Sequence, residues 1–141
     1  MADQIYPCIW FDGQAKAAAE FYGSIFPNSK ITTENPIVVL FELNGFKFMG
    51  LNGGPQFTPN EAVSFVVNCE DQAEIDHYWY KLIADGGEES MCGWLKDKYG
   101  VSWQIVPKTL GKLMSDPEKG QRVMNAFLKM RKFDIQALLD A

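Results

Sequence analysis

The order of apolar and polar residues in the first half predicts a strand followed by a helix. Residues 5–11 form an apolar run typical of a strand, and Asp12-Gly13 provides a turn with a possible helix cap. Between residues 14 and 26, apolar side chains recur at helical spacing, at Ala18, Phe21, Tyr22 and Ile25. This spacing predicts a helix that buries one face.

Two more apolar runs follow, at 37–43 and 46–51, on either side of Asn44-Gly45. That pair supplies the positive φ angles of a two-residue hairpin turn. We expect a further short strand, weakly marked in the sequence, near residues 29–33.

The second half shows the same order of elements. A strand is expected at 62–69, and Asp71 with Glu74 resembles a capping box at the start of a helix. The apolar stripe of that helix comprises Ile75, Tyr78, Trp79, Leu82 and Ile83. A short strand near 88–92 precedes a hairpin over residues 94–107 that turns at Tyr99-Gly100.

Matching features of the two halves lie at nearly equal offsets. Gly100 follows Gly45 by 55 residues, and Asp71 follows Asp12 by 59. Such offsets indicate a duplication. We therefore predict an α+β fold in which two βαβββ modules form an eight-stranded mixed sheet cup.

We predict one domain over residues 1–141, with modules at 4–57 and 60–108 and C-terminal helices at 109–141. Within that tail, residues 115–118 (Ser-Asp-Pro-Glu) favour a helix start, and Val123, Met124, Phe127 and Leu128 form the expected buried stripe. A last short helix is expected from Asp134.

The composition of the chain argues against nucleic acid and membrane as partners. The net charge of −5 argues against nucleic acid, which requires a basic surface. The N-terminal residues lack the features of a signal peptide, and no apolar run approaches membrane-spanning length, so we expect a cytoplasmic protein without a membrane partner.

The cysteines and the histidine suggest no metal motif. Cys8, Cys69 and Cys92 are odd in number and widely spaced, which fits neither a disulfide framework nor a zinc site. His77 lies about 200° around the predicted helix from Ile75 and is expected to face solvent.

Three stretches carry a resemblance to a known family: residues 11–15 (FDGQA), 20–22 (EFY) and 92–107 (CGWLKDKYGVSWQIVP). With the paired modules, they resemble the PhnB-like branch of the vicinal oxygen chelate superfamily, which includes glyoxalase I and extradiol dioxygenases. That branch carries the label demethylubiquinone 3-methyltransferase-like. The chain has no glycine-rich loop between a strand and a helix, which a Rossmann-type methyltransferase would use to bind the methyl donor.

The resemblance also implies where a metal would bind. Superfamily enzymes hold a divalent metal through His or Gln on the first strand of each module and Glu on the fourth. The matching positions are Tyr6, Met49, Ser64 and Gln104. Because none is a carboxylate or an imidazole, we expect no metal and no other cofactor.

Strand alternation predicts which side chains line the cup. The candidate ligand-binding residues are Tyr6, Cys8, Trp10, Met49, Ser64, Asn68, Ser102 and Gln104, with Lys47 and Val66 beside them. Such a mainly apolar wall with a few hydrogen-bonding groups is typical of a small-molecule pocket. Alternatively, these polar groups bond one another and fill the cup. Cys8 is the one candidate nucleophile, although the sequence places no base beside it; we assign no catalytic residue.

Three functions follow as hypotheses. The first is a metal-free small-molecule-binding protein of the glyoxalase-like superfamily. The second is an enzyme, either a lyase, isomerase or dioxygenase of that superfamily or the methyltransferase that the label names. The third is a structural module with a filled cup. By resemblance and from the surplus of aromatic residues, we expect a homodimer.

Overall fold

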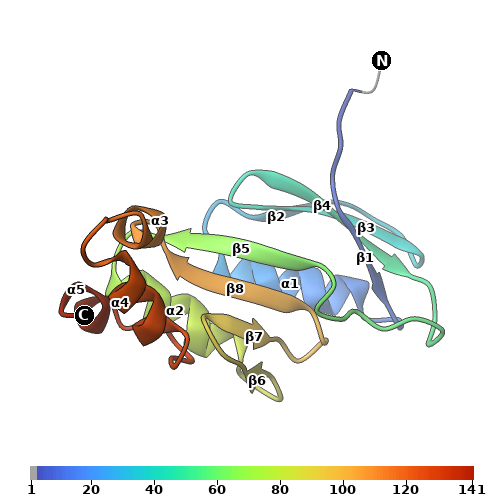
Figure 1. Ribbon diagram of the computed structural model, residues 1–141. Coiled ribbons are helices and arrows are strands. Elements are labelled where there is room, and N and C mark those ends of the chain that lie inside the picture. Colours follow the sequence, from blue (N-terminus) through green and yellow to red (C-terminus); the bar gives the residue numbers. More distant parts are fainter. Residues whose placement is uncertain (1–2) are drawn as a thin grey trace. The chain divides into compact units, whose positions relative to one another are not determined.

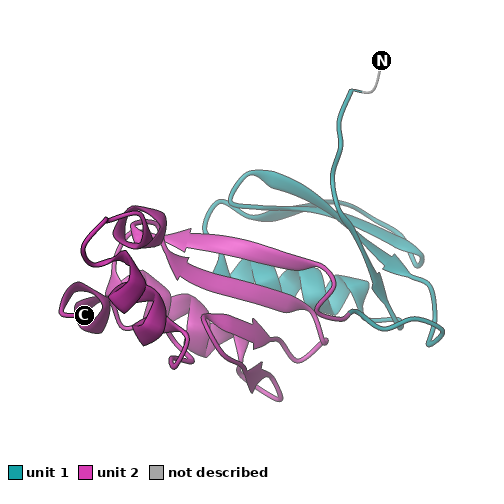
Figure 2. Cartoon of the chain, in the orientation of Figure 1, with its two compact units in different colours: residues 1–59 teal, residues 60–141 magenta. Residues whose placement is uncertain are grey.

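The computed structural model describes residues 3–141 (Figure 1). The chain divides into two compact units, one ending at Pro59 and the other running from Asn60 to Ala141 (Figure 2). Within the described residues, no helix is both long and apolar enough to cross a membrane.

Unit 1, up to Pro59, contains one helix and a four-stranded sheet. Its elements are β1 (Cys8–Phe11), α1 (Ala15–Ile25), β2 (Lys30–Glu34), β3 (Val38–Leu43) and β4 (Phe46–Asn52). The strand order is β1-β4-β3-β2, with β1 parallel to β4 and the other pairs antiparallel. Each expected element of the first half is therefore present.

Helix α1 packs on β3 and β4 through its buried residues Ala15, Ala18, Ala19, Tyr22 and Ile25. Gly50 permits this close packing, because a Cβ added there would lie 3.0 Å from the Cβ of Ala15. The predicted hairpin turn is confirmed: Asn44 and Gly45 have φ angles of 52° and 82°.

The helix cap predicted at Asp12 is wrong. The helix begins after Gln14, and the first helical N–H, that of Ala15, donates to the side chain of Asn52 at 2.9 Å. Asn52 on β4 thus takes the place of a local cap. Because it lies 37 residues along the chain from Ala15, the residues next to the helix do not predict this contact.

Unit 2, from Asn60 to Ala141, repeats this plan. Its elements are β5 (Ser64–Cys69), α2 (Gln72–Leu82), β6 (Glu88–Glu89), β7 (Trp94–Lys96) and β8 (Ser102–Pro107). The strand order β5-β8-β7-β6, with β5 parallel to β8, matches that of unit 1. Asp71 caps α2 by accepting from the backbone N–H of Glu74 at 2.9 Å, as its sequence predicts.

The α+β class and the duplicated βαβββ plan are confirmed. Among the described residues, the eight strands are divided between two four-stranded mixed sheets, one in each unit, rather than hydrogen-bonded into one. Each parallel pair joins the first and fourth strands of a module, so the duplication extends to strand pairing.

Three C-terminal helices follow β8: α3 (Leu110–Met114), α4 (Gly120–Phe127) and α5 (Ile135–Leu139). They confirm the helical tail expected at 109–141. Helix α4 begins later than its expected start, since Asp116 instead accepts from the N–H groups of Glu118 and Lys119 in a turn. The predicted stripe of α4 is only partly correct. Val123 is buried, whereas Met124 and Leu128 are exposed.

Candidate ligand-binding site

The predicted site residues lie on one face of each sheet, the face opposite its packed helix, here called the open face. In unit 1, Cys8 and Trp10 alternate with the buried Ile9 and Phe11, and Cys8 pairs with Met49 in the register of β1 and β4. Tyr6 precedes β1 and is half-buried. In unit 2, Ser64, Asn68, Ser102 and Gln104 share the open face of β5 and β8.

Trp10 is held in place by the segment after β4. Its indole Nε1 donates to the carbonyl oxygen of Gly54 at 2.8 Å, and the Phe57 ring packs edge-on with a centroid distance of 4.9 Å. A Cβ at Gly53 would lie 2.3 Å from the indole, so only glycine permits this contact. The ring of Trp10 therefore already has an aromatic neighbour.

Tyr6 also has a neighbour. The ammonium of Lys47 lies 4.2 Å from the Tyr6 ring centroid and donates to the side chain of Gln4 at 3.2 Å. Lys47 is thus engaged in a cation–π contact next to Met49 on the open face.

The thiol of Cys8 is a poor nucleophile. Although its side chain reaches solvent, partial burial raises its pKa above the ordinary value of 9.0. A raised pKa lowers the fraction of thiolate, which is the attacking species. Cys69 is fully buried, and burial raises its pKa to about 12.

Gln104 and Ser64 are brought together. The amide Nε2 of Gln104 donates to the hydroxyl of Ser64 at 2.9 Å, diagonally across β8 and β5, since the residue paired with Gln104 is Val66. Two of the predicted polar groups therefore bond each other. Asn68, farther along β5, is exposed.

Ser102 is the exception among these polar groups. Its side chain is 1% exposed, and its hydroxyl has no hydrogen-bond partner among the described residues. A buried hydroxyl without a partner loses its hydration without compensation. Ser102 is therefore a buried polar group of the open face with unused bonding capacity.

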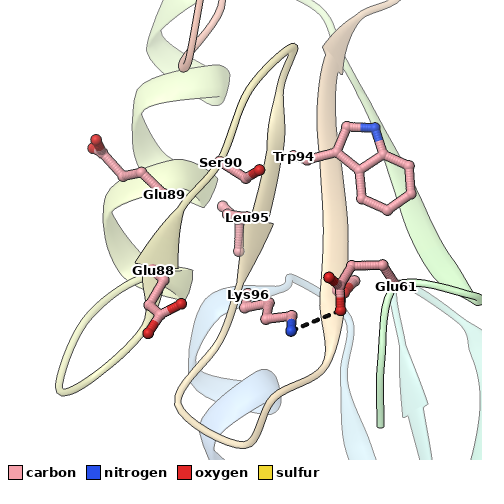
Figure 3. A pocket seen from close by; sticks show the side chains of 8 residues that line it. Glu61, Glu88, Glu89, Ser90, Trp94, Leu95 and Lys96 are labelled. Carbon is pink, nitrogen blue, oxygen red and sulfur yellow. Dashed lines mark ion pairs between the residues drawn. The ribbon is translucent and has the colours of Figure 1, made fainter.

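Sequence reasoning missed two residues that share this face. Strand β7 pairs Trp94 with Gln104 and Lys96 with Ser102, so the indole and the ammonium flank the predicted residues. Lys96 forms an ion pair with Glu61 at 2.7 Å (Figure 3). Applying strand alternation to both arms of the hairpin over residues 94–107 would have revealed Trp94 and Lys96.

These residues border a hollow of about 160 Å³ in unit 2. Its wall includes Ser102 and, as labelled in Figure 3, Glu61, Glu88, Ser90, Trp94 and Lys96. The hollow is therefore bordered by residues of β6, β7 and β8 and by Glu61, which precedes β5.

The side chains at the four implied metal positions do not suit a divalent metal. Tyr6 and Met49 lie in unit 1 and Ser64 and Gln104 in unit 2, and all four side chains are neutral. Among residues 3–141, no group of three His, Cys, Asp or Glu side chains could hold a metal ion. His77 is exposed, as predicted, and its ring packs against Tyr78.

A methyl donor finds no Rossmann-type site in the described residues. Each sheet has one parallel strand pair, between the first and fourth strands of a module, rather than successive parallel strands. The helix N–H of Ala15 that follows the β1 turn is already bonded to Asn52.

Comparison with known proteins places these features in a family. Residues 3–106 match the sequence model of a family described as 3-demethylubiquinone-9 3-methyltransferase. This match ends within β8 and leaves the C-terminal helices outside it. No curated protein sequence matches the chain.

Solved structures support the same assignment. The PhnB protein from Bacillus cereus, named as a candidate 3-demethylubiquinone-9 3-methyltransferase, is 34% identical with a TM-score of 0.66, and the match covers 74% of this chain and 99% of that one. A protein from Pseudomonas aeruginosa shares the fold at 18% identity and a TM-score of 0.61, with coverage of 75% and 98%. A glyoxalase-related enzyme from Fulvimarina pelagi also shares the fold, at 20% identity and a TM-score of 0.52. That match covers 74% of this chain and 87% of the other.

Proposed function

The chain belongs to the family described as 3-demethylubiquinone-9 3-methyltransferase, which has a glyoxalase-like fold, and from this premise we propose that it binds a small molecule without a metal. The observation that carries the proposal is the neutral chemistry at the four implied ligand positions. Gln104 replaces the expected glutamate, and its amide bonds Ser64. Neutral amide, hydroxyl, thioether and phenol groups are weak ligands for divalent metals.

The open face of unit 2 supports a partly apolar or aromatic ligand. Val66 is 54% exposed there, and Trp94 lies next to Gln104. An apolar surface with a few hydrogen-bonding groups suits a small molecule that has a flat body and a polar edge. Ser102, Gln104 and Asn68 are the groups that would orient such an edge.

A metal-binding experiment tests the first part of this proposal. The protein is dialysed against Zn²⁺, Mn²⁺, Ni²⁺ and Fe²⁺, and bound metal is measured by mass spectrometry. We expect far less than one ion per chain. Gln104→Glu restores the carboxylate expected from the superfamily and should raise uptake above that of the wild type. Tight stoichiometric metal in the wild type would contradict the proposal.

A thermal-shift screen over metabolites tests the second part. A ligand that binds only the folded state adds RT ln(1 + [L]/Kd) to the free energy of unfolding, about 2.7 kcal/mol at a hundred times Kd. We expect at least one metabolite to raise the melting temperature. A screen with no stabilising compound would favour a structural module whose polar groups satisfy one another, as Gln104 and Ser64 do.

Methyl transfer is the second candidate function, because the family description and the relative from Bacillus cereus both name it. Calorimetry with S-adenosylmethionine and a quinol analogue decides this point. Binding of both compounds by the wild-type protein would establish the candidate. No heat of binding for S-adenosylmethionine would remove it.

A further inference from the structure

The hollow next to Ser102 carries an excess of negative charge. Three carboxylates, those of Glu61, Glu88 and Glu89, border it together with one ammonium, that of Lys96. Glu61 is paired with Lys96 at 2.7 Å. Glu89 turns to other partners, accepting from the indole of Trp79 at 3.0 Å and lying 3.7 Å from Arg131.

Glu88 is therefore the carboxylate left for a ligand. Among the described residues its side chain forms no ion pair or hydrogen bond, and it is paired with Lys96 in the register of β6 and β7. Figure 3 shows Lys96 stretching toward Glu61, while the Glu88 side chain extends from β6. Since Glu61 neutralises Lys96, the remaining charge is negative and favours a cation.

Two further groups in the wall suit a protonated amine. The indole of Trp94 can attract a cation to its ring face. The hydroxyl of Ser102, which is buried and has no partner in the described chain, can accept a hydrogen bond from an ammonium N–H. This unpartnered group is independent of the carboxylates and belongs to the wall of the hollow.

We propose that this hollow is a binding subsite for a small protonated amine, with Glu88 as the charge partner, Trp94 as the ring contact and Ser102 as the hydrogen-bond acceptor. The inference rests on the proposed function and specifies the ligand's chemical class. The volume of about 160 Å³ is small for a ligand site, so the subsite takes a small amine or the amino end of a longer molecule.

Three probes of similar size and different charge test the proposal: benzylamine, benzyl alcohol and benzoate. Binding to the full chain is measured by isothermal titration calorimetry at neutral pH and low salt. We expect benzylamine to bind at least about tenfold more tightly than either other probe, because only it carries a positive charge. Tighter binding of benzoate, or no binding of benzylamine, overturns the proposal.

Two variants test the proposed contacts, and a third is the control. Glu88→Gln should weaken benzylamine binding about two- to fivefold, the effect of one partly exposed charge pair. Ser102→Ala should weaken it about fivefold or more by removing the acceptor. Glu118→Gln, an exposed site before α4, removes the same charge elsewhere in unit 2 and should leave the affinity unchanged.

The variant Lys96→Met tests whether the subsite prefers cations or anions. Methionine keeps most of the side-chain stem but removes the ammonium, which frees the Glu61 carboxylate for the ligand. We expect benzylamine to bind about two- to fivefold more tightly. If Lys96 itself contacts the ligand, as in a site for anions, the variant would bind the probe less tightly than the wild type. That result would overturn the proposal. Circular dichroism and thermal unfolding of each variant establish that it is folded.

The outcomes separate this inference from the proposed function. If benzylamine fails while metabolites of another class stabilise the protein, the amine subsite is wrong and small-molecule binding stands. If neither the probes nor the metabolites bind, both proposals fail.

Discussion

At the scale of single residues, Asp97 organises the hairpin over residues 94–107. It is 3% exposed and accepts from the backbone N–H groups of Tyr99 and Val101 at 2.8 and 3.1 Å. Its other oxygen accepts from the Trp103 indole at 2.9 Å. The carboxylate thereby holds the loop between β7 and β8 and places Ser102 and Gln104 at their positions on β8.

We predict that Asp97→Ala lowers the free energy of unfolding by about 3 kcal/mol, because hydrogen bonds to a charged acceptor are lost and buried donors remain unpaired. Asp97→Asn should cost less, since its amide oxygen still accepts. Urea denaturation measures both. The exposed Asp12 serves as the control, and a loss no greater than that of Asp12→Ala would contradict this role of Asp97.

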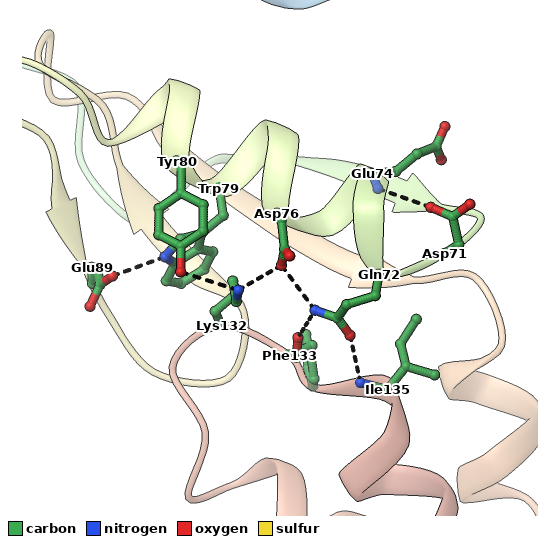
Figure 4. Close-up of polar contacts among 10 residues, drawn as sticks. All are labelled: Asp71, Gln72, Glu74, Asp76, Trp79, Tyr80, Glu89, Lys132, Phe133 and Ile135. Carbon is green, nitrogen blue, oxygen red and sulfur yellow. Dashed lines mark hydrogen bonds and ion pairs between the residues drawn. The ribbon is translucent and has the colours of Figure 1, made fainter.

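At the scale of elements, the C-terminal segment is attached to α2 by polar contacts (Figure 4). The amide of Gln72 donates to the carbonyl of Phe133 at 2.9 Å, and its oxygen accepts from the N–H of Ile135 at 2.8 Å. Lys132 pairs with Asp76 at 2.6 Å on the next turn of α2. These contacts join a helix inside the family match to a segment outside it.

Gln72→Ala should therefore loosen the segment around α5. We expect the free energy of unfolding to fall by about 1–2 kcal/mol, because the N–H of Ile135 loses its partner. Hydrogen exchange of residues 133–139 should accelerate more than exchange in β8. Gln121→Ala removes an exposed amide from α4 and is the matched control. If residues 133–139 exchanged equally fast in Gln72→Ala and Gln121→Ala, Gln72 would not hold the C-terminal segment on α2.

The Asp76–Lys132 pair predicts a pH dependence of stability. Hydrogen bonds from Lys132 and Gln72 hold the pKa of Asp76 below its ordinary value of 3.8. Its stabilising contribution is therefore complete above that value and is lost as the pH falls through the lowered pKa. The difference in the free energy of unfolding between wild type and Asp76→Asn should shrink on acidification. In a Lys132→Met background the pH dependence should be smaller.

The partner of Asp76 behaves in the opposite sense. Although burial opposes it, hydrogen bonds to Asp76 and Tyr80 raise the pKa of Lys132 above 10.5. The contribution of Lys132 to the free energy of unfolding is therefore complete below its ordinary pKa. This contribution disappears as the pH rises through the raised pKa of the folded state. The contact between α2 and the tail is thus most stable between the two extremes.

At the scale of the whole molecule, the predicted homodimer and cytoplasmic location stay predictions. Large apolar side chains are exposed in each unit, with Phe46 at 69% and Val63 at 66%. Burying such side chains against a second copy would remove apolar area from water. Light scattering after size exclusion should give twice 15.9 kDa. A mass of one chain at every concentration would refute the dimer.

The local elements followed from the sequence because their causes are local. The spacing of Tyr22 and Ile25, the Asn44-Gly45 pair and the cap at Asp71 each act over a few residues, and each has the predicted structure. The duplicated plan followed for the same reason, since both modules repeat these signals. Strand alternation also explains why Trp103 and Ile105 are buried, on the face of β8 opposite Gln104.

What only the tertiary structure decided is how groups distant in sequence meet. The cap of α1 comes from Asn52, the bond partner of Gln104 is Ser64, and Lys96 pairs with Glu61. Strand pairing and loop paths create these contacts, and no local pattern encodes them. The sequence by itself determined the α+β modules and the neutral side chains at the positions where the resemblance implies metal ligands. The burial of Ser102 without a partner, and the acidic hollow beside it, arise only when β7 and β8 pair.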